Sequence, residues 1–452
     1  MSGRIEKMEV SRLQLICLVA LASVLTGPVS AQIKTLSVRK ALRETQRTRW
    51  RQLAFLVVGD WNRHRATERH VVLTDDHLTE DGKIKAAVFG QIARLEQLVS
   101  LSAANSPLSD SGLAQIAKLT RLRQLDLGGS EVTAKGLRIL SGLSQLERLS
   151  LANTQVDTLA VAALVKLKKL RSLDLSSYTI KDDALKSLAQ AKQLKELVLD
   201  SSSISDAGLE HLTACKSLER LALNGTAISD SGMGRVAKIG SLKILDLYDT
   251  KIGDKGVAKL SGTRLVGLNL EICSQVSTVA LKSIGKIRSL RGLVLKKTGF
   301  EKIKIKGEGL KHLQPLTKLE LLDLYAVSVS NDTLVYLTPM KQLRSLNLAC
   351  TTTTDAATVH LQKLKGLRSL VIAYQEGFGG PVIGDVGAKR LAKLSELRSL
   401  NLIANPVTDA TLSELQKLKR LRRLRIVGTK ISKAAVAAFR KAKPKCIVEF
   451  DQ

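Results

Sequence analysis

Residues 194–217 have the sequence LKELVLDSSSISDAGLEHLTACKS, and this 24-residue pattern decides the fold. Its leucines at 194, 197 and 199 return 24 residues later as Leu218, Leu221 and Leu223. The same L-x-x-L-x-L step recurs along most of the 452-residue chain, and such an internal repeat is typical of a solenoid. The copies, about fourteen in number, begin at Leu98, Leu122, Leu146, Leu170, Leu194, Leu218, Leu242, Leu265, Leu290, Leu319, Leu343, Leu367, Leu397 and Leu421.

Each copy contains the parts of one strand, one turn and one helix. Leucines at alternate positions, such as Leu197 and Leu199, point to one side of a strand. Small polar residues then turn the chain, and a β-branched residue such as Ile204 enters the core. The Ser-Asp-Ala-Gly sequence at 205–208 offers side chains that cap the free N–H groups of a following helix. Because strands pack closer together than helices, we expect a curved stack with its strands inside.

This repeat resembles that of the leucine-rich-repeat family over roughly residues 98 to 444. Its form, L-x-x-L-x-L-x-x-[T/S]-x-[I/V]-[T/S]-D-x-G-L, is similar to the repeats of exported bacterial proteins and of F-box ubiquitin-ligase receptors. The resemblance implies an α/β solenoid, a curved horseshoe with parallel strands on the concave face and helices on the convex face. Cys273 keeps the family's residue at the ninth repeat position, where Thr154, Thr226 and others carry a hydroxyl that can still bond the turn backbone.

The first 31 residues have the order of a secretory signal peptide. A positive start and an apolar run are followed by Val29-Ser30-Ala31, so cleavage is expected after Ala31. An uncleaved membrane anchor is the alternative, although the run is short for a bilayer. A signal peptide implies a secreted or periplasmic protein, or one of the cell envelope, with no transmembrane helix after cleavage.

The remaining segments are expected to close the ends of the stack. Residues 32–97 are predicted to form a basic helical cap, with a helix over residues 36–58, since an open solenoid end must be covered. An arm that touches an anionic surface is the alternative. Residues 445–452 are predicted to form a capping strand at the other end. Two longer units carry insertions near Phe300 and Phe378, which border a binding site or are neutral loop variation.

The chain is strongly basic, with 71 Lys and Arg against 41 Asp and Glu and a formal net charge of +30. This excess favours anionic partners, of which an acidic envelope polysaccharide or an acidic protein suits an exported chain, and no specific nucleic-acid target is indicated. The alternative is that basic residues, which recur in every repeat, keep a long solenoid soluble.

The concave face is the expected binding surface, chiefly between Leu242 and Leu402. A basic residue often follows the first leucine of a unit, and Asp or Asn often separates the last two, although these two rows can also pair with each other. Tyrosines follow the third leucine in two units, where exposed aromatic rings are typical contact anchors or ordinary surface variation. The predicted ligand-binding residues are Asp246, Tyr248, Asp249, Glu271, Arg291, Asp323, Tyr325, Arg344, Arg368 and Tyr374.

No residue pattern indicates catalysis, a metal or a cofactor. His211, His312 and His360 lie in units that are not neighbours, and the mature cysteines show no C-x-x-C spacing, so buried free thiols are expected. The leading hypothesis is a non-catalytic scaffold for protein–protein interaction through the concave face. The alternatives are a structural cell-envelope protein that binds anionic polymers and, from the F-box resemblance, a ligase-receptor-like substrate binder.

Overall fold

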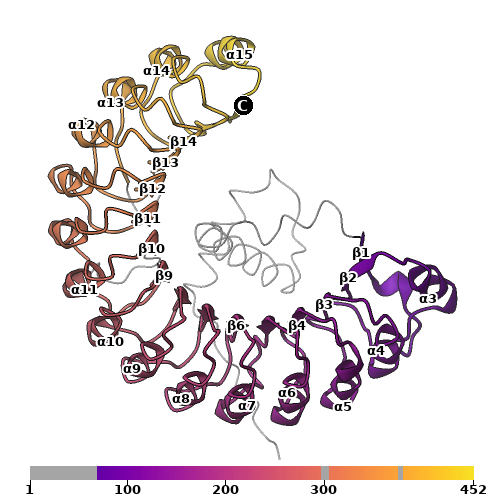
Figure 1. The fold of residues 1–452 in the computed structure, drawn as a ribbon. Helices are drawn as coiled ribbons and strands as arrows, with labels where there is room; N and C mark the ends of the chain where they lie inside the picture. The colour runs from indigo at the N-terminus through magenta and orange to yellow at the C-terminus, as the bar shows by residue number, and fades with distance from the viewer. Residues whose placement is uncertain (1–68, 297–304, 375–379, 452) are drawn as a thin grey trace, which may run out of the picture.

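The computed structural model describes residues 69–296, 305–374 and 380–451, which form a curved solenoid (Figure 1). Within these residues, sixteen strands pair in parallel and in chain order to form one sheet along the concave face. The strands are β1 Arg69–Val72, β2 Leu98–Ser102, β3 Gln124–Asp126, β4 Arg148–Ser150, β5 Ser172–Asp174, β6 Glu196–Val198, β7 Arg220–Ala222, β8 Ile244–Asp246, β9 Gly267–Asn269, β10 Gly292–Val294, β11 Leu321–Asp323, β12 Ser345–Asn347, β13 Ser369–Val371, β14 Ser399–Asn401, β15 Arg423–Arg425 and β16 Ile447–Glu449.

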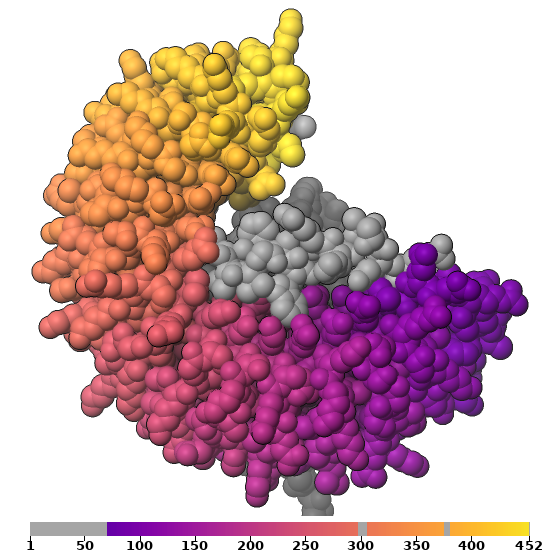
Figure 2. Space-filling view, viewed as in Figure 1, coloured from indigo at the N-terminus to yellow at the C-terminus, as the bar shows by residue number. Residues whose placement is uncertain are grey.

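The leucines of the repeat form a continuous core between the strands and the outer layer. Leu194, Leu197 and Leu199 are all at most 1% exposed, as are most of their equivalents in other units. Each well-buried leucine stabilises the fold by roughly 1.5–3 kcal/mol. The space-filling view shows the stacked units as one unbroken curved wall (Figure 2). The predicted leucine-rich-repeat solenoid, with strands on its concave face, is therefore confirmed.

The outer layer is less regular than one helix per unit. A unit of about 24 residues leaves room for only one or two helical turns, and 3-10 turns span such a gap with fewer residues. The α-helices are α3 Ala86–Ala93, α4 Asp110–Ile116, α5 Ala134–Leu137, α6 Thr158–Leu164, α7 Asp182–Leu188, α8 Leu209–Leu212, α9 Met233–Val236, α10 Asp254–Lys259, α11 Thr278–Ile284, α12 Thr358–Leu361, α13 Asp385–Leu391, α14 Asp409–Leu415 and α15 Lys433–Ala442. The 3-10 helices are η2 Asp75–His77, η3 Arg138–Gly142, η4 Gly307–Leu313, η5 Asp332–Leu337 and η6 Asp355–Ala357.

The Ser/Thr-Asp-x-Gly motif ties neighbouring units together. Asp110 accepts hydrogen bonds from the next unit's Thr133, at 2.8 Å from the backbone nitrogen and 2.6 Å from the hydroxyl. The Asp182–Ser205 pair repeats this geometry, at 2.7 and 2.6 Å. The sequence predicts that these residues cap their own helix. The aspartate instead bonds the following unit, and only some of the hydroxyls, such as that of Thr133, also cap the helix they precede.

The glycine of this motif is explained by the same contact. A Cβ on Gly136 would lie 2.1 Å from Asp110 Oδ1, and one on Gly208 would lie 2.3 Å from Asp182 Oδ1. A side chain at either position would displace the aspartate from its hydrogen bonds. Glycine is therefore required here for close approach between units and not for an unusual backbone angle.

The ends of the sheet extend beyond the regular repeat. Strand β1 pairs with β2, one strand before the first leucine repeat at Leu98, and β16 pairs with β15 at the other end. The helix predicted over residues 36–58 and the insertions around Phe300 and Phe378 lie outside the described residues.

Candidate binding surfaces on the concave face

Two groups of polar side chains stand out on the concave side of the sheet. The first lies at the carboxyl ends of β5 to β11, and the second precedes the amino ends of β12 to β15. We call the first the acid–tyrosine cluster; it comprises Asp174, Asp200, Asn224, Asp246, Tyr248, Asn269, Glu271, Lys296, Asp323 and Tyr325. We call the second the arginine row; it comprises Arg344, Arg368, Arg398 and Arg422.

Hydrogen bonds across strands hold the centre of the acid–tyrosine cluster. Asn224 Oδ1 accepts a bond from the backbone nitrogen of Tyr248 at 2.9 Å. Asn269 Nδ2 donates to Asp246 Oδ1 at 2.8 Å, and the backbone nitrogen of Glu271 donates to Asn269 Oδ1 at 2.9 Å. These bonds fix the carboxylates and tyrosines on a rigid sheet, so the cluster is organised before any partner arrives.

Lys296 joins the acidic part of the cluster to a tyrosine. Its Nζ lies 3.2 Å from Glu271 Oε1 and 4.8 Å from the centre of the Tyr325 ring. The side chains of Lys296 and Glu271 are 12% and 2% exposed, so both charges are largely removed from water. The attraction within a buried ion pair barely compensates for the loss of hydration of its two charges. Stabilisation of the fold alone is therefore a poor explanation for this pair.

Burial raises the pKa of three carboxylates of the cluster, those of Asp200, Asp246 and Asp323. Burial, together with the charges of Asp246 and Asp174, raises the pKa of Asp200 to about 8. Burial raises the pKa of Asp246 to about 6, although hydrogen bonds from Tyr248 and the neighbouring asparagines oppose the shift. Burial also raises the pKa of Asp323. Shifted groups that gather on one face mark a candidate functional site, since catalytic and binding sites perturb pKa values by burial and by neighbouring charges.

The predicted ligand-binding residues fall into both groups, but not all are open to solvent. Tyr248 and Tyr325 are half-buried, and Asp249 beside them is exposed. Asp246 and Glu271, which the sequence places on the solvent side, are 4% and 1% exposed because side chains of adjacent strands cover them. Tyr374 is 36% exposed and follows β13, away from the other two tyrosines.

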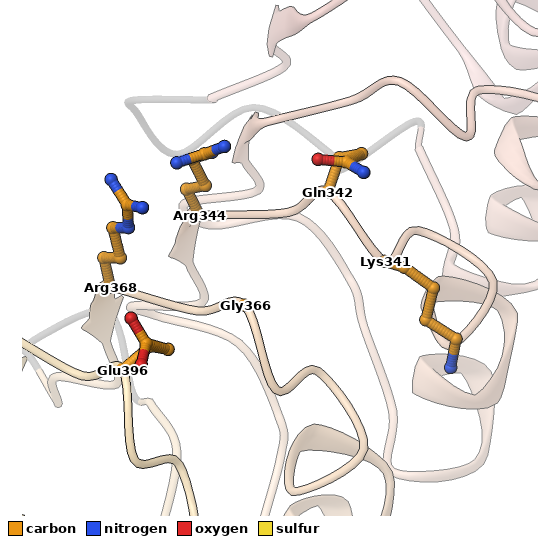
Figure 3. A pocket seen from close by; sticks show the side chains of 6 residues that line it. All are labelled: Lys341, Gln342, Arg344, Gly366, Arg368 and Glu396. Carbon is orange, nitrogen blue, oxygen red and sulfur yellow. The ribbon is translucent and has the colours of Figure 1, made fainter.

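The predicted pairing was between the basic row and the row of Asp or Asn residues, whereas the ion pairs of Glu320 lie within the basic row itself. Glu320 forms ion pairs with Arg291 on one side and with Arg344 on the other, the latter at 3.5 Å. Arg344 and the next arginine, Arg368, then line a shallow pocket of about 110 Å³. They project from neighbouring strands in the same direction, with Glu396 beside Arg368 and Lys341 pointing away (Figure 3).

Five members of the cluster were not among the predicted residues: Asp174, Asp200, Asn224, Asn269 and Lys296. Asp200 and Lys296 each directly follow the third leucine of a unit, as Tyr248 and Tyr325 do. Aligning that one position over all units would have revealed both, because parallel strands in register bring it into a single row.

Neither a metal site nor a membrane-spanning helix is found in the parts of the chain that the structure describes. Residues 69–296, 305–374 and 380–451 contain no group of three His, Cys, Asp or Glu side chains suited to a metal ion. No helix within those ranges is both long and apolar enough to cross a membrane. The expected free and buried thiols are confirmed for Cys215, Cys273, Cys350 and Cys446.

Known repeat families match part of this architecture. Residues 143–250 match the model described as FBD-associated F-box protein At5g56370, LRR repeats, and residues 241–261 match one described as Leucine Rich repeat. The repeat and its sheet thus define a leucine-rich-repeat solenoid, and residues 143–261 are similar to leucine-rich-repeat family models. No curated protein matches the sequence.

Two solved structures are similar to the chain. A leucine-rich-repeat protein of Leptospira interrogans is 20% identical, with 85% of this chain and 96% of that chain covered and a TM-score of 0.48. An internalin of Listeria monocytogenes is 18% identical, with 85% and 87% covered and a TM-score of 0.39.

Proposed function

We propose that this chain is a non-catalytic scaffold that binds a protein partner on its concave face, centred on the acid–tyrosine cluster. The observation that carries the proposal is the arrangement of Tyr248 and Tyr325 on either side of the desolvated Glu271–Lys296 pair. The fold does not need this arrangement, because other units close their strands with small residues such as Gly128 and Ala349 at the same register position.

The chemistry of the cluster favours a partner that presents a basic side chain. Five carboxylates face a single lysine, so the cluster is acidic even though the whole chain is basic. A lysine or arginine of the partner, placed between Asp200 and Asp246, would stabilise the ionised form of these carboxylates, which burial disfavours in the free protein. The tyrosines would supply rigid contact area beside it. An extracellular or periplasmic partner suits the signal peptide expected at residues 1–31.

A paired substitution tests the proposal. The full chain, immobilised as bait, should capture a defined partner that the Tyr248→Ala/Tyr325→Ala variant captures at least about tenfold less well, because hot-spot aromatic residues each contribute about 2 kcal/mol or more. Tyr178→Ala is the matched control, since Tyr178 is 76% exposed and lies in the turn after β5, outside the cluster. Circular dichroism should show the same folded content in all three proteins. Unchanged capture by the double variant would refute the concave-face proposal.

A further inference from the structure

The arginine row is fixed by the sheet itself. The backbone nitrogens of Arg368, Arg398 and Arg422 each donate to the carbonyl of the preceding row member, at 2.7, 2.8 and 2.8 Å. The residues that follow, on β12 to β15, are in exact parallel register. The four side chains therefore start from equivalent points on consecutive strands, about 4.8 Å apart.

The row differs from the equivalent positions earlier in the chain. There, acidic residues interrupt the basic ones: Glu147 lies 3.9 Å from Arg123, and Glu219 pairs with Lys195 at 3.6 Å and Lys243 at 3.0 Å. Glu320 is the last acidic residue at this position of the repeat, and each of the next four units has an arginine there. Positive charge accumulates at this end of the concave face.

The described residues do not neutralise most of the row. Within the described ranges, Arg368, Arg398 and Arg422 form no ion pair, and the nearby Glu396 is paired with Arg420. Partial burial and the charges of Arg344 and Arg398 lower the pKa of Arg368, as expected for like charges held close together. Three like charges held in line repel one another, so stability does not explain the row.

We propose that the arginine row is the docking surface for an acidic α-helix of a protein partner, lying across the strands of β12 to β15. Three strand spacings span about 14 Å. Glutamates at positions i, i+3, i+7 and i+10 of a helix lie on one face and span about 15 Å, since the rise is about 1.5 Å per residue. Carboxylates on alternate residues of an extended peptide would span about 20 Å and lose the match.

Arginine is well suited to such a partner, because its planar guanidinium binds a carboxylate with two parallel hydrogen bonds. Single-stranded nucleic acid would need aromatic side chains on which bases can stack, and the row contains none. The inference deepens the proposed function and rests on it, since it names the chemistry of a second contact on the same concave face.

Binding of synthetic peptides tests the row directly. The probe is an alanine-rich helix of about 20 residues, long enough to be helical, with four glutamates at i, i+3, i+7 and i+10. The comparison peptide has the same composition with its glutamates distributed around the helix. We expect the one-faced peptide to bind the full chain at least about tenfold more tightly in fluorescence anisotropy. The Arg368→Gln/Arg398→Gln variant should lose this preference.

The control variant is Arg138→Gln/Lys186→Gln, which removes the same charge from exposed positions on the helical side. It should keep the preference for the one-faced peptide. The inference would be overturned if the two peptides bound equally, or if the control variant lost the preference as completely as the row variant. It would also be overturned if heparin, a flexible polyanion, bound in a way that depends on the row while the two peptides bound equally. The Tyr248→Ala/Tyr325→Ala variant should still bind the peptide, so failure of the row and failure of the proposed function give different results.

Discussion

The contact between Gly136 and Asp110 offers a sharp test of how adjacent units are joined. Gly136 is the third residue of α5, and a Cβ there would lie 2.1 Å from Asp110 Oδ1 and 2.4 Å from its Cγ. Gly136→Ala must therefore push the carboxylate away from both donors of Thr133. The helix alone would gain from this change, since alanine is favoured over glycine by about 1 kcal/mol in a helix interior.

The balance can be worked out from these contacts. Two hydrogen bonds to this solvent-accessible carboxylate stabilise the junction by about 2 kcal/mol, which is about 1 kcal/mol each, the net value of a typical hydrogen bond. We expect Gly136→Ala to lower the free energy of unfolding by about 1 kcal/mol, the loss of about 2 less the helical gain of about 1. Asp110→Ala should cost about 2 kcal/mol. In that background Gly136→Ala should instead stabilise the protein by about 1 kcal/mol, because the obstructing carboxylate is gone.

The double-mutant cycle is measured by urea denaturation followed by circular dichroism, with hydrogen exchange at the Thr133 amide as a local readout. The exchange measurement matters because a repeat array need not unfold in one cooperative step. The two changes should show a coupling of about 2 kcal/mol. If Gly136→Ala destabilised the protein equally with and without Asp110, the aspartate contact would not be the reason for the glycine.

Two further predictions concern the cluster and the chain start. Asp200→Asn should raise the free energy of unfolding relative to the parent protein, and denaturation curves should show this gain growing from about pH 4 to about pH 8. The reason is that the raised pKa of Asp200 makes the parent lose stability as pH rises through that window. A gain that does not depend on pH would contradict this prediction. Export of the full chain should yield a protein whose sequence starts at Gln32, checked by N-terminal sequencing, whereas a retained Met1 would contradict cleavage after Ala31.

The repeat made most of the fold predictable. The spacing of Leu194, Leu197 and Leu199 fixes which side chains enter the core, and a recurrence of 24 residues fixes the stacking. The turn chemistry also followed from the sequence: the hydroxyl of Thr154 donates to the Leu151 carbonyl at 2.6 Å, as expected for a residue replacing the family's amide. Asn405 keeps that amide and donates to the Ile372 carbonyl of the preceding unit at 2.7 Å.

The contacts between units were harder to foresee, because a pattern within one repeat does not show which unit a side chain reaches. Asp182 is the first residue of its own helix, yet its side chain bonds to Ser205 in the next unit. The burial of side chains on the concave face was also hard to predict from the pattern of a single repeat. The alternation of a strand places Glu271 towards solvent, but its neighbours on adjacent strands reduce its exposure to 1%.

The concave positions can carry binding chemistry because the fold does not constrain them. The position of the arginine row is occupied by Glu219 in one unit, Val266 in another and Arg398 in a third, while the backbone hydrogen bonds between strands stay at 2.7 to 3.0 Å. The aspartate of the Ser/Thr-Asp-x-Gly motif has no such freedom, because its hydrogen bonds and the glycine opposite it depend on each other. Charges that accumulate where the fold tolerates any side chain therefore indicate binding, and this holds most clearly at Arg368 and Arg398, where the accumulated charge opposes folding.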